Sequence, residues 1–90
     1  MADNAAPLPL SLLDTLTLRE WRALLHMADD LRNPQIAEAM CITVKSVEEY
    51  HTRIGNKLDL RGPGLLQQFA RRHREALWKR YNKLYPPPLI

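Results

Sequence analysis

The helical spacing of apolar residues is the feature that most constrains this chain. From Thr17 to Leu84 apolar side chains recur at steps of three and four residues, and no segment alternates with the two-residue period of a strand. The three glycines all lie between positions 55 and 64, so the chain lacks the turn residues that a series of hairpins needs. With 90 residues, the chain is expected to form one small all-α domain.

Start signals divide this pattern into helices. Thr17 and Glu20 have the spacing of a capping box, which predicts the start of the first helix. Asn33 followed by Pro34 is typical of an N-cap and a first helical position, and predicts a short second helix. A third helix is expected to begin at Thr43. The run Gly-Pro-Gly at 62–64 then separates it from an extended fourth helix.

The expected organisation is an arm, a helical domain and a tail. Residues 1–15 contain two prolines and are expected to form an N-terminal arm with one extra helical turn near Leu12. Residues 16–85 are expected to form the four-helix domain, and residues 86–90 a Pro-rich tail.

The second and third helices have the spacing of a helix-turn-helix unit. Ala37 is a small residue at the position where two steeply crossing helices must touch, and Val47 supplies an apolar side chain from the third helix at the same crossing. Cys41 lies in the turn and Ile42 is expected to close it. Many helical hairpins share part of this spacing, so the pattern alone leaves open whether the unit reads DNA.

A longer run of residues resembles a known family. The positions that carry the resemblance are Leu16-Thr17-Leu18-Arg19-Glu20, Leu24, Ala28, Asn33, Ile36-Ala37, Met40, Ile42-Thr43, Lys45-Ser46-Val47, Ile54 and Lys57-Leu58. This run is similar to the LuxR-type (GerE/NarL-like) DNA-binding domain, without gaps from Leu16 to about Ala70. The resemblance implies a four-helix bundle with the helix-turn-helix at about 33–52. It also implies a third helix that enters the DNA major groove and a fourth that commonly supports dimerisation.

The chain departs from the family pattern at several positions. Cys41 stands in the turn where the family usually has glycine, and a left-handed conformation there costs about 1 kcal/mol. Asp30 and Asp59 likewise replace common glycines at helix ends. The remaining departures, Pro34 for a Lys, Glu48 for a Lys and Tyr50 for a His, all lie in the helix-turn-helix.

The resemblance and the exposed positions of the third helix give a set of candidate DNA contacts. These are Thr43, Lys45, Ser46, Glu48, Glu49, Tyr50, Thr52, Arg53 and Lys57. Hydroxyl groups and lysines are expected to contact phosphate, Arg53 a phosphate or a guanine, and Glu48 or Glu49 cytosine N4. Without the resemblance, the same residues describe a solvated charged helix face.

The net charge of +3 is unevenly distributed. Residues 43–58, which include the expected reading helix, carry only +1, whereas residues 59–90 carry +5. The charge therefore permits a polyanionic partner but locates most of the basic excess outside the helix-turn-helix.

The extended fourth helix carries an apolar and aromatic stripe that predicts a partner surface. Its members are Leu77, Trp78, Tyr81, Leu84 and Tyr85. A homodimer through this stripe would place two reading helices on two half-sites. The alternative is that residues 8–13 fold back over the stripe within one chain.

Other classes of function find little support. His26, His51 and His73 lie on three different expected helices and Cys41 has no CxxC partner, so neither a metal site nor a catalytic set is predicted. No cofactor and no membrane span is expected, and the resemblance implies a cytoplasmic, nucleoid-associated bacterial protein.

The prediction is therefore sequence-specific binding of double-stranded DNA and regulation of transcription, without enzymatic activity. RNA polymerase or another regulator is a further candidate partner. The alternative is a degenerate helix-turn-helix that serves as a protein–protein interaction or dimerisation module with weak or no DNA binding. Glu48, Glu49 and Pro34 favour that alternative.

Overall fold

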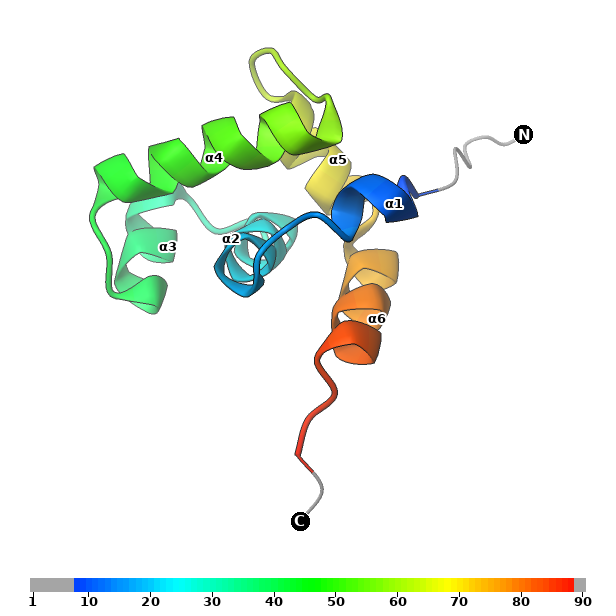
Figure 1. Ribbon diagram of the computed structural model, residues 1–90. Coiled ribbons are helices and arrows are strands. Elements are labelled where there is room, and N and C mark those ends of the chain that lie inside the picture. The colour runs from blue at the N-terminus through cyan, green and yellow to red at the C-terminus, as the bar shows by residue number, and fades with distance from the viewer. Residues whose placement is uncertain (1–7, 89–90) are drawn as a thin grey trace.

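The computed structural model describes residues 8–88, and these are helical throughout except for short connections. Six helices follow one another along the chain: α1 (Leu10–Leu13), α2 (Leu18–Ala28), α3 (Asn33–Met40), α4 (Val44–Leu58), α5 (Leu65–Arg72) and α6 (Arg74–Leu84). No strand occurs in the described range. The all-α prediction is confirmed, with the extra turn near Leu12 present as α1 (Figure 1).

The predicted continuous fourth helix is wrong. It is divided at His73, whose φ of −107° and ψ of 22° lie outside the helical region, into α5 and α6. The His73 ring packs on Phe69 with the ring centroids 4.9 Å apart. The division changes the direction of the chain, and it allows both α5 and α6 to pack against α2. Apolar spacing continues across His73, and neither glycine nor proline marks the break, so the sequence pattern does not reveal it.

The first predicted cap is confirmed and the second is displaced by one residue. At α2, the Glu20 N–H donates to the Thr17 Oγ1 at 3.1 Å and the Thr17 N–H donates to the Glu20 Oε1 at 2.9 Å. At α3, Arg32 is the N-cap in place of Asn33, and its N–H donates to the Gln35 Oε1 at 2.8 Å. Asn33 is therefore the first helical residue, and the N–H of the cap residue is satisfied by a side chain from within the helix.

Helices α2, α3 and α4 end in the same way, with a left-handed residue that is not glycine. Asp30, Cys41 and Asp59 have φ values of 68°, 58° and 58°. In each case the next residue closes a Schellman motif with its N–H; Ile42, for example, donates to the Ala37 carbonyl at 2.9 Å. These are the three positions at which the sequence replaces a family glycine, so the backbone keeps the left-handed turn without the residue that best tolerates it.

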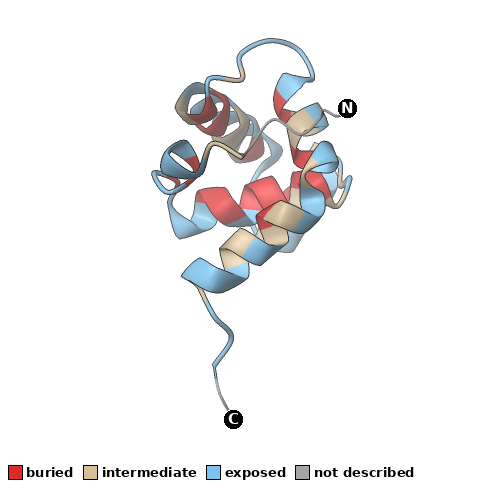
Figure 2. Ribbon diagram, turned by 90° about the vertical axis from the view of Figure 1, so that its right-hand side faces the viewer, coloured by how far each residue is buried: buried red, intermediate tan, exposed pale blue. Residues whose placement is uncertain are grey.

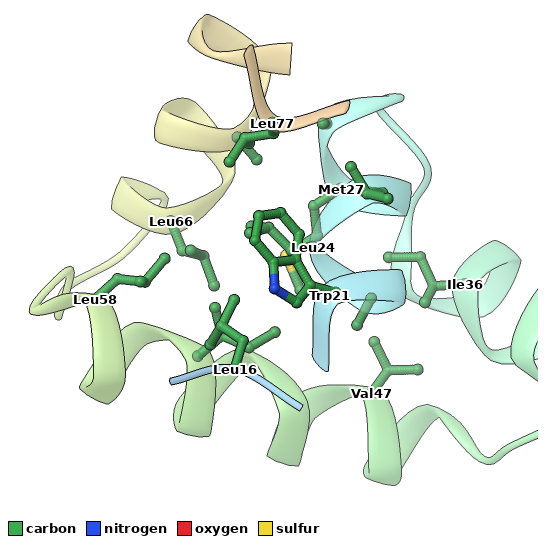
Figure 3. Packing of buried hydrophobic residues seen from close by; sticks show 14 of the residues in the cluster. Leu16, Trp21, Leu24, Met27, Ile36, Val47, Leu58, Leu66 and Leu77 are labelled. Carbon is green, nitrogen blue, oxygen red and sulfur yellow. The ribbon is translucent and has the colours of Figure 1, made fainter. Parts of the chain in front are cut away.

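The core is built around α2. Trp21 is fully buried and its indole lies among side chains from the neighbouring helices (Figure 3). Helix α2 packs against α4 and α5 and also against α6, whereas α4 and α6 do not contact each other. The buried residues accordingly lie on the helix faces that point inward (Figure 2). They are Leu13, Leu16, Trp21, Ala23, Leu24, Leu25, Met27, Ala28, Ile36, Ala37, Val47, Ile54, Leu58, Leu66, Ala70 and Leu77.

The predicted fold-back of residues 8–13 over the aromatic stripe is not what the structure shows. Helix α1 packs against α4, and Leu13 is fully buried there. Asp14, which follows the end of α1, binds the Arg80 guanidinium of α6 at 2.6 Å. The aromatic residues of α6 are covered instead by α2, with the Trp21 and Tyr81 ring centroids 6.2 Å apart.

Candidate nucleic-acid interface

Helices α3 and α4 form the two arms of a helix-turn-helix. Ala37 and Val47 are both buried where these helices cross, as the spacing predicts. Met40 and Ile42 are half-buried against the core, so the turn is held by apolar contacts as well as by its backbone hydrogen bonds. The crossing fixes which side of α4 faces inward and leaves the other side open to solvent.

The N-terminal end of α4 is capped by hydroxyl groups. The Ser46 N–H donates to the Thr43 Oγ1 at 3.0 Å, and the two hydroxyl oxygens lie 3.0 Å apart. Lys45 is exposed beside them. The first backbone N–H groups of α4 have no carbonyl partner within the helix and carry the positive end of its dipole. This end of α4 therefore suits a phosphate group.

Five of the predicted contact residues surround one shallow hollow on the exposed face of α4. They are Lys45, Glu48, Glu49, Thr52 and Arg53. The Thr52 hydroxyl donates to the Glu48 carbonyl at 3.2 Å, so it is engaged within the helix. The hollow thus brings together two cations and two carboxylates, and its summed charge is zero.

Arg53 and Tyr50 form a small assembly with a residue that the sequence reasoning missed. The Arg53 guanidinium carbon lies 5.1 Å from the centroid of the Tyr50 ring, and the Tyr50 hydroxyl accepts a hydrogen bond from the Arg19 Nε at 3.0 Å. Arg19 comes from α2, 31 positions away in the sequence. It lies within the run that resembles the family, but its distance from the helix-turn-helix gave no reason to place it beside α4.

Arg53 remains available to a ligand. Its nearest carboxylate, Glu49, is 4.0 Å away, and both side chains are 56% exposed. An exposed pair at this distance contributes about 0–1 kcal/mol, which is too little to hold the guanidinium against a phosphate or a base. Tyr50 is half-buried and packs against the core, so its ring serves as a support under Arg53.

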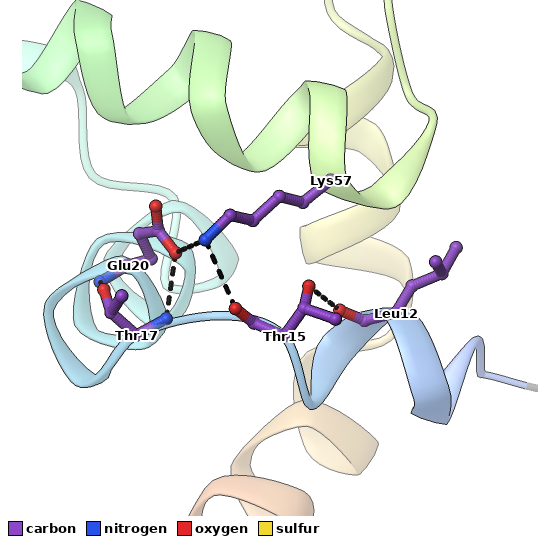
Figure 4. A network of polar contacts seen from close by, with 5 residues as sticks. All are labelled: Leu12, Thr15, Thr17, Glu20 and Lys57. Carbon is purple, nitrogen blue, oxygen red and sulfur yellow. Dashed lines mark hydrogen bonds and ion pairs between the residues drawn. The ribbon is translucent and has the colours of Figure 1, made fainter.

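The ammonium of Lys57 is engaged within the chain. Its ammonium donates to the Glu20 Oε1 at 2.7 Å and to the Thr15 carbonyl at 3.2 Å (Figure 4). Glu20 is 2% exposed and is also bound by the N–H of Thr17. Burial raises the pKa of the Glu20 carboxyl, but the hydrogen bonds from Lys57 and Thr17 and the charges of Lys57 and Arg53 outweigh this effect and leave the pKa below its usual value. The Glu20 carboxylate therefore competes with a DNA phosphate for the Lys57 ammonium.

The basic excess of the C-terminal third is largely paired with acidic residues of the N-terminal half. Arg71 lies 3.6 Å from the Asp30 carboxylate and Arg74 lies 2.6 Å from Asp29. Arg80 binds Asp14 through both of its carboxylate oxygens. These pairs join α5 and α6 to the ends of α1 and α2. Much of the positive charge that the sequence locates at 59–90 therefore has a local counter-charge.

The predicted partner stripe on α6 is only partly accessible. Leu77 is 0% exposed and belongs to the core, so it is not a partner contact. Trp78, Tyr81 and Tyr85 are half-buried and pack against the core, with the Tyr81 and Tyr85 ring centroids 5.3 Å apart. Leu84, at 38% exposure, is the most accessible residue of the stripe.

The three histidines lie on α2, on α4 and between α5 and α6. Burial lowers the pKa of His51, against the opposing charge of Glu48, and burial together with the charge of Arg72 lowers the pKa of His73. Within residues 8–88, no three side chains of His, Cys, Asp or Glu come together as metal ligands would. Cys41 is exposed and unpaired in that range. No described helix is both long and apolar enough to cross a bilayer.

Comparison with known proteins agrees with this geometry. The sequence model of the GerE family, described as bacterial regulatory proteins of the luxR family, matches residues 14–64, which is more than half of the chain. Searches of curated proteins and of solved structures find no match. The matched residues run from the end of α1 to the start of α5, and they contain the whole helix-turn-helix. This family consists of DNA-binding transcription regulators with a helix-turn-helix, and the chain belongs to it.

Proposed function

We propose that the chain recognises a specific duplex sequence by inserting α4 into the major groove. The observation that carries the proposal is the exposed face of α4, which presents Lys45, Glu48, Glu49 and Arg53 around one hollow while its other face is fixed by the helix-turn-helix crossing. A helix in the major groove presents its N-terminal turns to base edges. The family match supports the same orientation.

The proposed contacts divide into those that position the helix and those that read bases. Thr43, Ser46 and Lys45 lie at the N-terminal end of α4, where hydroxyl and ammonium groups can bind phosphate. Arg53 supplies a fork of donors that suits guanine O6 and N7 or a phosphate, and a carboxylate of Glu48 or Glu49 suits the amino group of cytosine. Lys57 is left out because Glu20 holds its ammonium.

The charge of this face predicts how affinity depends on salt. Lys45 and Arg53 are balanced by Glu48 and Glu49, and Arg19 adds one cation at the edge. With about two or three phosphates neutralised per chain, log K should fall with log salt at a slope of roughly −2 to −3. Binding to random duplexes should therefore be weak, and discrimination should come from the base contacts.

We further propose that two chains bind together through the C-terminal end of α6. Leu84 is exposed there, and Tyr81 and Tyr85 are half-buried beside it. A two-fold contact at this end would place one α4 on each half-site of a palindromic operator. Sedimentation of the protein and of Leu84→Glu tests this step, since the variant should remain a monomer at concentrations where the parent chain dimerises.

Selection of duplexes from a random library followed by titration tests the proposed function. An enriched sequence should bind well above random DNA. Arg53→Ala should weaken binding to it by about 5- to 150-fold, equivalent to about 1–3 kcal/mol per base contact. Lys79→Ala is the matched control, because Lys79 is an exposed cation on α6, and it should change the affinity by less than about twofold. Failure to enrich any sequence, or equal losses for both variants, would contradict the proposal.

A further inference from the structure

A groove beside α2 has an apolar floor that the proposed DNA contacts on α4 do not use. It lies between α2, α3 and α6 and encloses about 380 Å³. Leu25, Met40, Trp78 and Tyr81 supply its apolar surface. Helix α2 separates it from α4, since α4 and α6 each pack against α2 without touching each other (Figure 1). Of its lining residues, Arg19 also lies at the edge of the α4 face, where its Nε donates to the Tyr50 hydroxyl, whereas the hollow on α4 shares no residue with the groove.

The aromatic part of the groove is held in place by its own contacts. The Trp78 Nε1 donates to the Asp29 carboxylate at 3.4 Å. The Trp78 and Tyr81 rings meet edge to face with their centroids 5.9 Å apart, and Tyr81 in turn packs on the buried Trp21. Because these rings are already ordered, a ligand that covers them loses little side-chain entropy on binding. The groove is therefore preformed.

The edge of the groove is cationic and has no counter-charge in the described part of the chain. Arg22 and His26 line it, and neither forms an ion pair there. Arg19 lines it as well, and its Nε donates to the neutral hydroxyl of Tyr50. No carboxylate lines the groove. Asp29, whose carboxylate accepts from Trp78, is already paired with Arg74 at 2.6 Å. The cations at the edge of the groove therefore remain available to an anionic ligand.

We propose that this groove docks an acidic segment of another protein, with one large apolar side chain lying against Trp78 and Tyr81 and carboxylates beside Arg19 and Arg22. The apolar floor and the cationic edge are complementary to such a segment in both shape and charge. A DNA backbone would satisfy the arginines but would leave the aromatic floor uncovered, and this favours a protein ligand. The proposal is independent of the DNA sequence that α4 reads.

A random library of 16-residue peptides displayed on phage, selected against the whole chain, tests the proposal. The selected peptides should combine a Trp, Phe or Leu with neighbouring Asp or Glu residues. Titration of a selected peptide into variants of the chain should show weaker binding for two different reasons. Arg22→Glu removes a positive charge from the edge and Ala39→Phe fills the groove, and each variant should bind the peptide about tenfold or more weakly than the parent chain. Lys79→Glu makes the same charge change outside the groove and should weaken it by less than about threefold.

Any of the following results would overturn the proposal. Absence of enriched peptides, enrichment of peptides that are not acidic, or equal binding by all three variants would show that the groove is not a docking site for an acidic segment. Loss of duplex affinity in Arg22→Glu, without loss of peptide binding, would assign the cationic edge to DNA. Conversion of a dimer to a monomer by Ala39→Phe in sedimentation would assign the groove to a second copy of the chain.

Discussion

Replacement of Cys41 by glycine should stabilise the protein. Cys41 has φ 58° and ψ 45°, and a residue with a Cβ in this left-handed conformation costs about 1–2 kcal/mol. Glycine removes that cost but loses more backbone entropy on folding, which returns roughly 0.5–1 kcal/mol. The side chain of Cys41 is exposed, so its removal opens no cavity. The expected net gain is about 0.5–1 kcal/mol, or a rise in Tm of about 2–8 °C for a domain of this size.

The matched control is Cys41→Ala. Alanine also removes the thiol but keeps the Cβ, so the left-handed strain remains and the stability should stay close to that of the parent chain. Urea and thermal unfolding of the three proteins measure the difference. If Cys41→Gly were no more stable than Cys41→Ala, the turn would carry no conformational strain and the reasoning would fail.

The same comparison at the two aspartates should give smaller effects. Aspartate tolerates the left-handed region better than most residues, because its short polar side chain can hydrogen-bond locally. Asp30→Gly would also remove a carboxylate 3.6 Å from Arg71, and Asp59→Gly one 3.0 Å from Arg61. The order of gain should therefore be Cys41 first, with both aspartates well behind it.

Three further predictions concern the core and its buried charge. Glu20→Ala should lower the free energy of unfolding by about 2–3 kcal/mol, because it removes a capping box and leaves the ammonium of Lys57 without its carboxylate. In the same urea titration the control Glu49→Ala should change the free energy of unfolding by less than about 0.5 kcal/mol, because its pair with Arg53 is exposed. Leu77→Ala should cost about 2–5 kcal/mol, because this side chain is 0% exposed; a loss below 1 kcal/mol would show that it is not in the core. The free energy of unfolding should fall as the pH is lowered from 8 to 4. The folded pKa values of His51 and His73 lie below their unfolded value of 6.5, so the unfolded chain binds protons at these residues first and acid favours it. Ionised Glu20 contributes stability above its unfolded pKa of 4.5, and this contribution is lost as the pH falls through its lower folded pKa. Urea midpoints across this range measure the effect, and a midpoint that is constant or rises on acidification would refute it.

The helix-turn-helix could be predicted from patterns within short stretches of the sequence. The Thr17–Glu20 cap depends on residues three positions apart, and the crossing of Ala37 and Val47 on residues ten positions apart, so spacing within a short stretch of chain predicts both. The left-handed turn at Cys41 was also accessible, because the family pattern places glycine there. The predicted set of DNA contacts on α4 remains a proposal, although five of its members share one hollow.

The features that could not be predicted from the sequence depend on contacts between residues far apart along the chain. The ammonium of Lys57 binds a carboxylate 37 positions away, and the guanidinium of Arg19 binds a hydroxyl 31 positions away. Neither pair has a fixed spacing that a pattern could detect. The break at His73 is similar, because the helical spacing of apolar residues continues through it and only the packing of α5 and α6 on α2 reveals the change of direction.

The ion pairs change what the basic composition means for DNA binding. The sequence locates a charge of +5 in residues 59–90, outside the helix-turn-helix. In the folded chain Arg71, Arg74 and Arg80 each face an aspartate, so their fields are largely cancelled at the distance of a DNA backbone. Within residues 8–88, other exposed cations have no such partner, among them Lys45 on α4, Arg22 in the α2–α3–α6 groove and Lys79 on α6. Free positive charge therefore does not by itself identify a binding face. Each proposed face must obtain its selectivity from the groups beside the charge, which are carboxylates and hydroxyls on α4 and aromatic rings in the groove.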